Sequence, residues 1–155
     1  FVVPPDTNTG PPAPDENTLR AVSIHLAKEL APLGVEVVVA APRYHRIRAI
    51  ASVVIDPAFD TTETIRRLLS ELNSYLHPLT GGDNGEGWPF GGTLRYSILV
   101  RRLLARTRGL LAISTLNFVV DGVRDLGCAD IQPSANALFW PEVHDVIVLE
   151  SEDAS

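Results

Sequence analysis

The side chains that could act as acids, bases or nucleophiles are scattered along the sequence. The four histidines are His25, His45, His77 and His144. No pair has the i, i+4 spacing of a helical metal site, so all four are expected to be surface or capping residues. The single cysteine, Cys128, has no neighbour that marks an activated nucleophile, and we expect a partly buried free thiol. These residues predict no catalytic group, no cofactor site and no metal site.

One stretch, residues 80–92, has a composition that excludes helix and strand. It reads Thr-Gly-Gly-Asp-Asn-Gly-Glu-Gly-Trp-Pro-Phe-Gly-Gly, with six glycines and one proline. Its acidic residues lack the fixed alternate positions of a calcium loop. Its glycines follow a predicted helix and lack the lysine and Ser/Thr of a phosphate-binding loop. What distinguishes this stretch is therefore its pair of aromatic side chains.

Trp88 and Phe90 are the only large side chains of this loop, and both need burial. In one interpretation they fold back under the flanking helices and hold the loop in place. In the other they anchor the loop in a neighbouring subunit, because tryptophan is frequent among the residues that dominate interface energies. The sequence leaves both interpretations open.

A basic group follows the loop and comprises Arg95, Arg101, Arg102, Arg106 and Arg108. On helical geometry Arg95, Arg102 and Arg106 share one side. That side is either a solvated face near the helix C-terminus or a contact for an acidic protein partner. Tyr96 is the only aromatic residue of the helix, so RNA and single-stranded DNA are not expected partners.

The composition is that of a globular chain. Its 155 residues are 45% hydrophobic and 21% charged, which suits one domain or two small ones. The 13 Lys and Arg against 19 Asp and Glu give a formal net charge of −6, which disfavours nucleic acid as a partner. The apolar runs are too short for membrane insertion, and one cysteine excludes an internal disulfide. Because the sequence has no methionine, we expect an internal or C-terminal segment of a longer polypeptide.

Residues 1–42 predict a βαβ module. The end of a strand at 1–3 is followed by a proline-rich loop, and a helix begins near Asp15 or Asn17, both good N-caps. The helix carries an apolar stripe, expected to be buried, of Leu19, Val22, Leu26, Leu30 and Leu33. The run 35–40 is rich in valine and predicts a strand buried on both faces.

Residues 43–155 predict a second module of the order β-α-α-β-β. A strand at 47–55 precedes a helix that Asp60 and Glu63 cap and that Pro78 ends. The apolar stripe of this helix is Ile65, Leu68, Leu69, Leu72 and Leu76. A third helix is expected at 93–107, with Leu94, Ile98, Leu99, Leu103 and Leu104 inward. Further strands are expected at 110–120, 123–131 and 143–150, with a tight turn at 121–122. The predicted class is α+β, with two small α/β sandwich modules and mixed sheets, joined near residues 42–46.

A recognisable pattern runs through residues 75–91. It comprises Leu76-His77-Pro78-Leu79-Thr80-Gly81-Gly82 and Gly87-Trp88-Pro89-Phe90-Gly91, with Pro42-Arg43-Tyr44 ahead of the second module's strand. The pattern resembles the C-terminal part of baseplate J-like proteins, the wedge components of contractile phage tails and extracellular contractile injection systems. The order of elements agrees with that family over residues 1–120. Gly92 departs from a position that is often basic, which weakens any inference of a charged contact there, and Gly109-Leu110 replaces the usual Gly-Val.

The resemblance implies a structural baseplate wedge protein with no enzymatic activity. It implies a large hetero-oligomer with six-fold symmetry, whose other members are wedge subunits, sheath-initiator proteins and the central spike or hub. The particle would be assembled in the bacterial cytoplasm, and some systems release it from the cell. The residues that the resemblance assigns to a structural or interaction loop are Pro78, Gly81, Gly82, Gly87, Trp88, Pro89, Phe90 and Gly91.

A rival hypothesis is a small-ligand-binding or enzymatic α/β domain that uses residues 81–92 as a lid. It predicts a pocket beside the loop, with converging polar groups and a shifted pKa.

Overall fold

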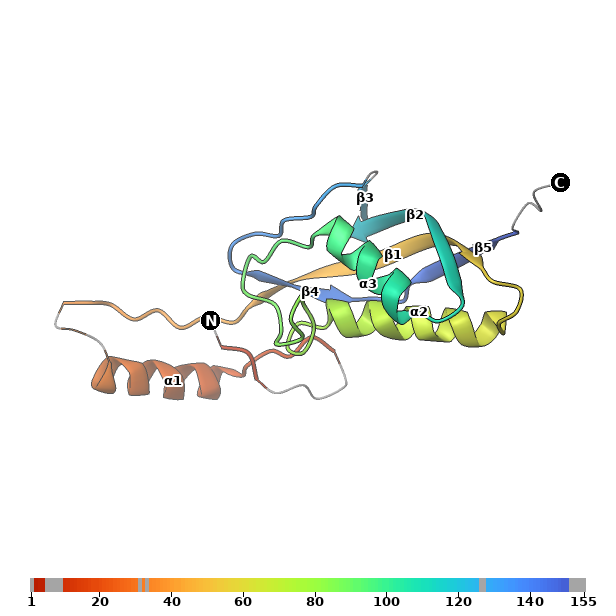
Figure 1. Cartoon of the computed structure of the whole chain (residues 1–155). Coiled ribbons are helices and arrows are strands. Elements are labelled where there is room, and N and C mark those ends of the chain that lie inside the picture. The colour runs from red at the N-terminus through yellow and green to blue at the C-terminus, as the bar shows by residue number, and fades with distance from the viewer. Residues whose placement is uncertain (1, 5–9, 31, 33, 126–127, 151–155) are drawn as a thin grey trace. The chain divides into compact units, whose positions relative to one another are not determined.

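The computed structural model describes residues 2–4, 10–30, 32, 34–125 and 128–150 (Figure 1). The chain divides into two compact units, Phe1–Tyr44 and His45–Ser155. Helices and strands are interleaved along the chain, and the sheet is mixed, so the predicted α+β class is confirmed. Among the residues described, every helix falls short of the length and apolar character that crossing a bilayer requires.

The described part of the N-terminal unit contains helix α1 (Glu16–Glu29). Asp15 is its N-cap, as predicted, and its side chain accepts a hydrogen bond from the Thr18 N–H at 2.6 Å. The Thr18 side chain and, second, this bond from its backbone N–H lower the pKa of the Asp15 carboxyl. The ends of the unit are joined by a hydrogen bond from the Val2 N–H to the Ala40 carbonyl, 3.2 Å long, and by one from the Tyr44 hydroxyl to the Pro12 carbonyl, 2.7 Å long.

The strands that a βαβ module requires are not found in the described residues of this unit. The prediction of a buried strand at 35–40 is wrong, because Val35 and Val38 are 55% and 78% exposed. A strand buried on both faces needs neighbouring strands on either side, and the described residues here supply none. The apolar stripe of α1 is likewise not buried, and Leu30 is exposed. The predicted stripe member Leu33 lies outside the described residues.

The C-terminal unit is built on a five-stranded mixed sheet. Its strands are β1 (Arg43–Ile55), β2 (Leu110–Val120), β3 (Val123–Asp125), β4 (Ala137–Pro141) and β5 (Asp145–Leu149). The order is β3-β2-β1-β4, and β5 also pairs with β1, in parallel. The central strand β1 pairs with β2 in antiparallel register, with Ala49 opposite Phe118 and Ala51 opposite Leu116. The predicted strand at 110–120 is confirmed at both ends, whereas β3 is shorter than the predicted 123–131.

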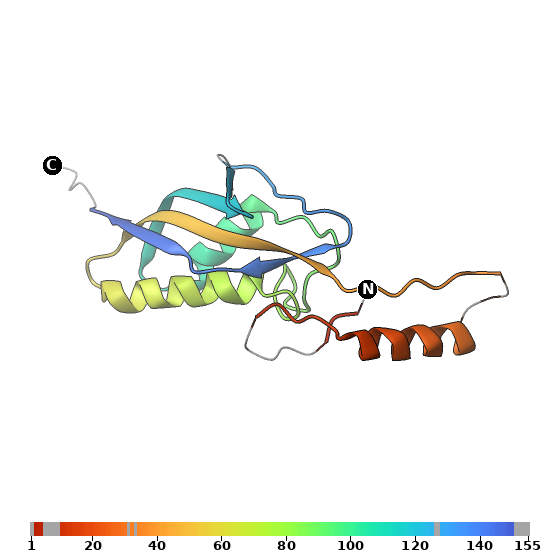
Figure 2. The same ribbon diagram turned by 180° about the vertical axis from the view of Figure 1, so that it is seen from behind.

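Two helices, α2 (Thr61–Leu76) and α3 (Tyr96–Arg106), lie on one face of this sheet. Figure 2 shows the opposite face, on which no described helix of this unit lies. Alternate residues of β1 point to the helices and are fully buried: Ile47, Ala49, Ala51 and Val53. Leu68 and Leu72 of α2 and Leu99 and Leu103 of α3 complete this core, and each contributes about 1.5–3 kcal/mol by burial.

Helix α2 begins as the sequence predicts, since the Asp60 side chain accepts a hydrogen bond from the Glu63 N–H at 2.7 Å. Glu63 in turn accepts hydrogen bonds from Arg66 and Arg67, which lower the pKa of its carboxyl to about 2. Helix α3 differs from the prediction at Leu104, which is 39% exposed and faces away from the core.

Two predictions about titratable residues are wrong. Cys128 is exposed rather than partly buried, because it lies outside the strands of the sheet, between β3 and β4. Burial raises the pKa of the Tyr96 hydroxyl, and the Cys128 thiol acts in the same direction. His144 is buried rather than a surface residue, with 6% of its area exposed.

His144 is held neutral by its position between β4 and β5. Its Nδ1 atom accepts a hydrogen bond from the Ala49 N–H of β1 at 3.0 Å, so the proton of the neutral ring is on Nε2. Nε2 is buried and has no hydrogen-bond partner among the described residues. Burial therefore lowers the pKa of His144 to about 4, although Asp145 acts in the opposite direction.

We expect this burial to make folding stability dependent on pH. In the unfolded chain His144 gains its proton near pH 6.5, whereas the folded chain resists protonation until about pH 4. The free energy of unfolding should therefore fall as the pH falls from 6.5 to 4, by on the order of 3 kcal/mol. His144→Asn keeps an acceptor near the Nδ1 position and cannot titrate. Urea unfolding at pH 7.5 and pH 4.5 should show a smaller loss of stability for this variant than for the unmodified chain. An equal loss in both would contradict the assignment.

Candidate functional site

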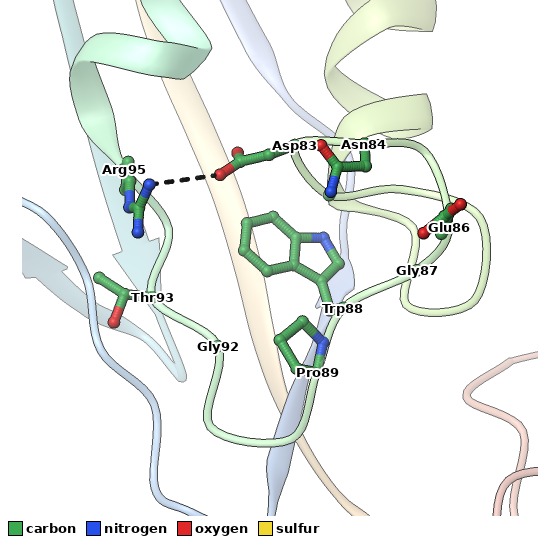
Figure 3. Close-up of a pocket in the computed structure, with 10 residues that line it drawn as sticks. Asp83, Asn84, Glu86, Gly87, Trp88, Pro89, Gly92, Thr93 and Arg95 are labelled. Atoms are coloured by element: carbon green, nitrogen blue, oxygen red, sulfur yellow. Dashed lines mark ion pairs between the residues drawn. The ribbon is translucent and has the colours of Figure 1, made fainter.

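The candidate site is the loop of residues 80–92, which joins α2 to α3 and which we term the glycine–aromatic loop. The structure confirms the prediction that it contains neither helix nor strand. Figure 3 shows residues of the loop, together with Thr93 and Arg95 after it, arranged around Trp88.

The backbone of the loop folds back onto the C-terminal end of α2. The Gly81 N–H donates to the His77 carbonyl at 2.9 Å, and the Gly82 N–H donates to the Tyr75 carbonyl at 2.8 Å. The Trp88 N–H then donates to the Pro78 carbonyl at 2.8 Å. The last carbonyls of a helix have no hydrogen-bond donors inside the helix. Here N–H groups of the loop act as donors to carbonyls at the end of α2. The backbone of the loop is thus anchored to the C-terminal end of α2.

Glycine is required at several of these positions by close approach of the backbone. A Cβ at Gly81 would overlap the carbonyl oxygen of Tyr75. Gly87 has a φ of +92°, and a Cβ there would lie 2.7 Å from the carbonyl oxygen of Leu79. Gly91 has a φ of +70°, and its N–H donates to the Ala137 carbonyl of β4 at 3.0 Å. These contacts fix the path of the loop at both ends.

Trp88 is packed against the core of the C-terminal unit. Its indole Nε1–H donates to the Tyr75 carbonyl at 2.9 Å. Its ring makes edge-to-face contacts with Tyr75, at 5.3 Å between ring centroids, and with Phe139 of β4, at 6.0 Å. The structure therefore places Trp88 in the inward orientation, where it holds the loop in place.

Phe90 differs from Trp88 in its exposure. It is 36% exposed, next to the exposed residue Pro89, at the outer end of the loop. The two aromatic residues that the sequence treats as a pair thus have separate environments. Trp88 supports the loop from inside, and Phe90 presents apolar surface outside.

A pocket of about 540 Å³ lies beside Trp88 (Figure 3). Its lining consists of Gly82, Asp83, Asn84, Glu86, Gly87, Trp88, Pro89, Gly92, Thr93 and Arg95. Asp83 is tied to the wall: its Oδ1 accepts a hydrogen bond from the Tyr75 hydroxyl at 2.7 Å, and its Oδ2 lies 3.9 Å from Arg95 Nη1. Burial, reinforced by the bond to Asp83, raises the pKa of Tyr75. Within the described residues, no group of three or more His, Cys, Asp or Glu side chains could hold a metal ion.

Tyr75 and Asp83 belong to the site, although the sequence alone did not indicate them as site residues. Tyr75 is the residue that connects the helix, the loop and the pocket, and its only signal is its position three residues after Leu72 on the buried side of α2.

The three arginines predicted to share one side have different surroundings. Arg95 is the N-cap residue of α3 and makes no capping hydrogen bond with its side chain. The Arg102 side chain is 14% exposed, because its Nε lies 3.3 Å from Glu71 Oε2 and its guanidinium lies over the Tyr75 ring at 5.3 Å. Arg106 is exposed in the last turn. Arg102 therefore joins α3 to α2 within the unit.

A second surface feature lies on the outer side of α3. Tyr96, Val100 and Leu104 recur every four residues and line an apolar hollow of about 630 Å³. The sequence indicates this second apolar surface, because Val100 and Leu104 each directly follow a buried leucine and so lie on a neighbouring face of the helix.

Two alanine substitutions at glycines with positive φ should separate two contributions to stability. One is the strain of the backbone conformation, and the other is the steric overlap of the added Cβ with neighbouring atoms. Gly85→Ala places a methyl group in open space, where the nearest atom is 3.9 Å away, and should cost about 1 kcal/mol for its φ of +74°. Gly87→Ala adds the overlap with Leu79 and should cost about 2–5 kcal/mol. Urea unfolding measures both, and equal losses would show that the loop is not held as described.

Comparison with known proteins leaves the family open. No family model and no curated protein matches this chain. Assignment of a function therefore depends on the residues and geometry of the glycine–aromatic loop.

Proposed function

We propose that the chain is part of a structural wedge protein in the baseplate of a contractile phage tail or contractile injection system. The observation that carries the proposal is the glycine–aromatic loop. The residues by which it resembles baseplate J-like proteins are the ones that fix its shape, from Gly81 and Gly87 to Trp88. A loop that Trp88 fixes from inside and that exposes Phe90 suits a docking role.

Rigidity favours such a role for a physical reason. A flexible loop loses conformational freedom when it binds, and this loss weakens the association. Here the backbone hydrogen bonds to α2 and the packing of Trp88 order the loop in the isolated chain. The exposed part of Phe90 can then contact an apolar surface of a partner without that cost, as aromatic residues at interfaces do.

The sheet offers a second mode of contact. Strand β5 pairs with β1, and its residues Ile147, Val148 and Leu149 are exposed apolar side chains. An exposed apolar strand at a sheet edge is suited to the addition of a strand from another chain. In the proposed ring the neighbours are other wedge subunits, sheath-initiator proteins and the central spike or hub, related by six-fold symmetry. The proposed place of action is the baseplate of the assembled particle, and the role that we propose for the chain there is structural rather than enzymatic.

The pocket of about 540 Å³ favours one alternative, a domain that binds a small ligand beside the loop. The two functions differ in their dependence on Phe90, which does not line the pocket. Loss of Phe90 should leave ligand binding intact and impair docking.

The wedge proposal is tested by Phe90→Ala in the gene that encodes this chain. Sheathed particles, counted by electron microscopy after sedimentation, should decrease because the docking side chain is lost. Phe59→Ala is a matched control, since Phe59 is 37% exposed and lies away from the loop, against Gly109. The two phenylalanine side chains are exposed to a similar fraction, so both variants should lose similar stability. Trp88→Ala should also impair assembly, but through loss of module stability. Normal particle numbers with Phe90→Ala would count against the proposed role.

A further inference from the structure

We propose that the pocket beside Trp88 binds one cationic side chain, a guanidinium or ammonium group, from a basic segment of a partner protein. This inference rests on the proposed docking function only for the source of the cation. The binding of the cation itself follows from the chemistry of the pocket.

The first argument is charge. The ionisable side chains that line the pocket are Asp83, Glu86 and Arg95, which leave one net negative charge. Arg95 and Asp83 already face each other, although at 3.9 Å and with 60% of the Arg95 side chain exposed. Glu86 is exposed and has no ion pair or hydrogen bond with any described residue. It is therefore available to a cation, in a chain whose formal charge is −6.

The second argument is the aromatic wall. Trp88 lines the pocket, while the only donor of its side chain, the indole Nε1–H, is used by the Tyr75 carbonyl. Figure 3 shows its ring between Asp83 and Pro89, with Arg95 and Glu86 at opposite sides. The face of an indole ring attracts cations, more strongly than the other aromatic side chains do. An anion would meet two carboxylates here and only one guanidinium, which Asp83 already attracts.

The third argument is access. Gly82, Gly87 and Gly92 form part of the lining and bring no side chain that would fill the pocket. Its volume lies in the range of small-ligand sites, which is sufficient for the head of an arginine or lysine. Asn84 adds an amide oxygen as an acceptor.

The proposal is tested on the chain alone by NMR titration with Nα-acetyl-arginine methylamide. The backbone amides of the loop and the indole signal of Trp88 should shift and saturate, with a Kd on the order of millimolar. Nα-acetyl-citrulline methylamide has the same shape without the charge and should give no saturable shift. Equal binding of both probes, or no saturable shift with arginine, would overturn the proposal.

Two substitutions of opposite effect sharpen the test. Glu86→Gln should raise the Kd for the arginine probe about two- to fivefold, because one exposed charge contact is lost. Arg95→Gln should lower it, since it removes the internal cation that competes for Asp83. Glu150→Gln removes an exposed charge outside the pocket and should leave the Kd unchanged. Equal Kd values for Glu86→Gln and Glu150→Gln would overturn the assignment of the site.

This titration is independent of the wedge proposal. A failed titration overturns the cation site and leaves docking through Phe90 standing. Normal particle assembly with Phe90→Ala counts against docking and leaves the measured Kd values unaffected.

Discussion

The carbonyl oxygen of Tyr75 is the acceptor on which the glycine–aromatic loop depends. It receives the Gly82 N–H at 2.8 Å and the indole Nε1–H of Trp88 at 2.9 Å. One backbone oxygen in the last turn of α2 thus fixes both the start of the loop and its largest side chain. A side chain at Gly81 would disturb both hydrogen bonds, because its Cβ would overlap this same oxygen. The glycines are needed because the loop closes on a helix end rather than extending into solvent.

From this acceptor the constraint extends to the sheet and to α3. The Tyr75 side chain is fully buried, its ring packs edge-to-face with Trp88, and its hydroxyl donates a hydrogen bond to Asp83. Trp88 in turn contacts Phe139 of β4. Arg102 of α3 lies over the Tyr75 ring and pairs with Glu71 of the same helix as Tyr75. The loop, both helices and one strand therefore share a single packed cluster, and the pocket is a hollow in its outer wall.

The sequence predicted correctly those features of the helices and strands that depend on residues close together in the chain. The Asp60 cap of α2 and the ends of β2 depend on residues close in the chain, and both agree with the structure. Features that depend on distant partners could not be predicted. His144 is buried because the Ala49 N–H, far away in the sequence, needs an acceptor. The apolar run 35–40 has strand composition, but composition does not specify which strand would pair with it. The different roles of Trp88 and Phe90 follow from the position of Tyr75, which the loop sequence does not contain.

The N-terminus of α3 shows where local stability gives way to another requirement. Arg95 places a positive charge at the positive end of the helix, an arrangement that costs about 0.3–1 kcal/mol, and it provides no capping bond. Asp130 supplies the missing acceptor from elsewhere in the chain, at 2.9 Å from the Tyr96 nitrogen. Helix α2, by contrast, begins with a favourable cap and an acidic first turn. Unfavourable local choices of this kind concentrate at functional sites. Arg95 lies on the pocket wall, so a helix end that its own N-cap residue does not cap coincides with the surface that we propose for binding.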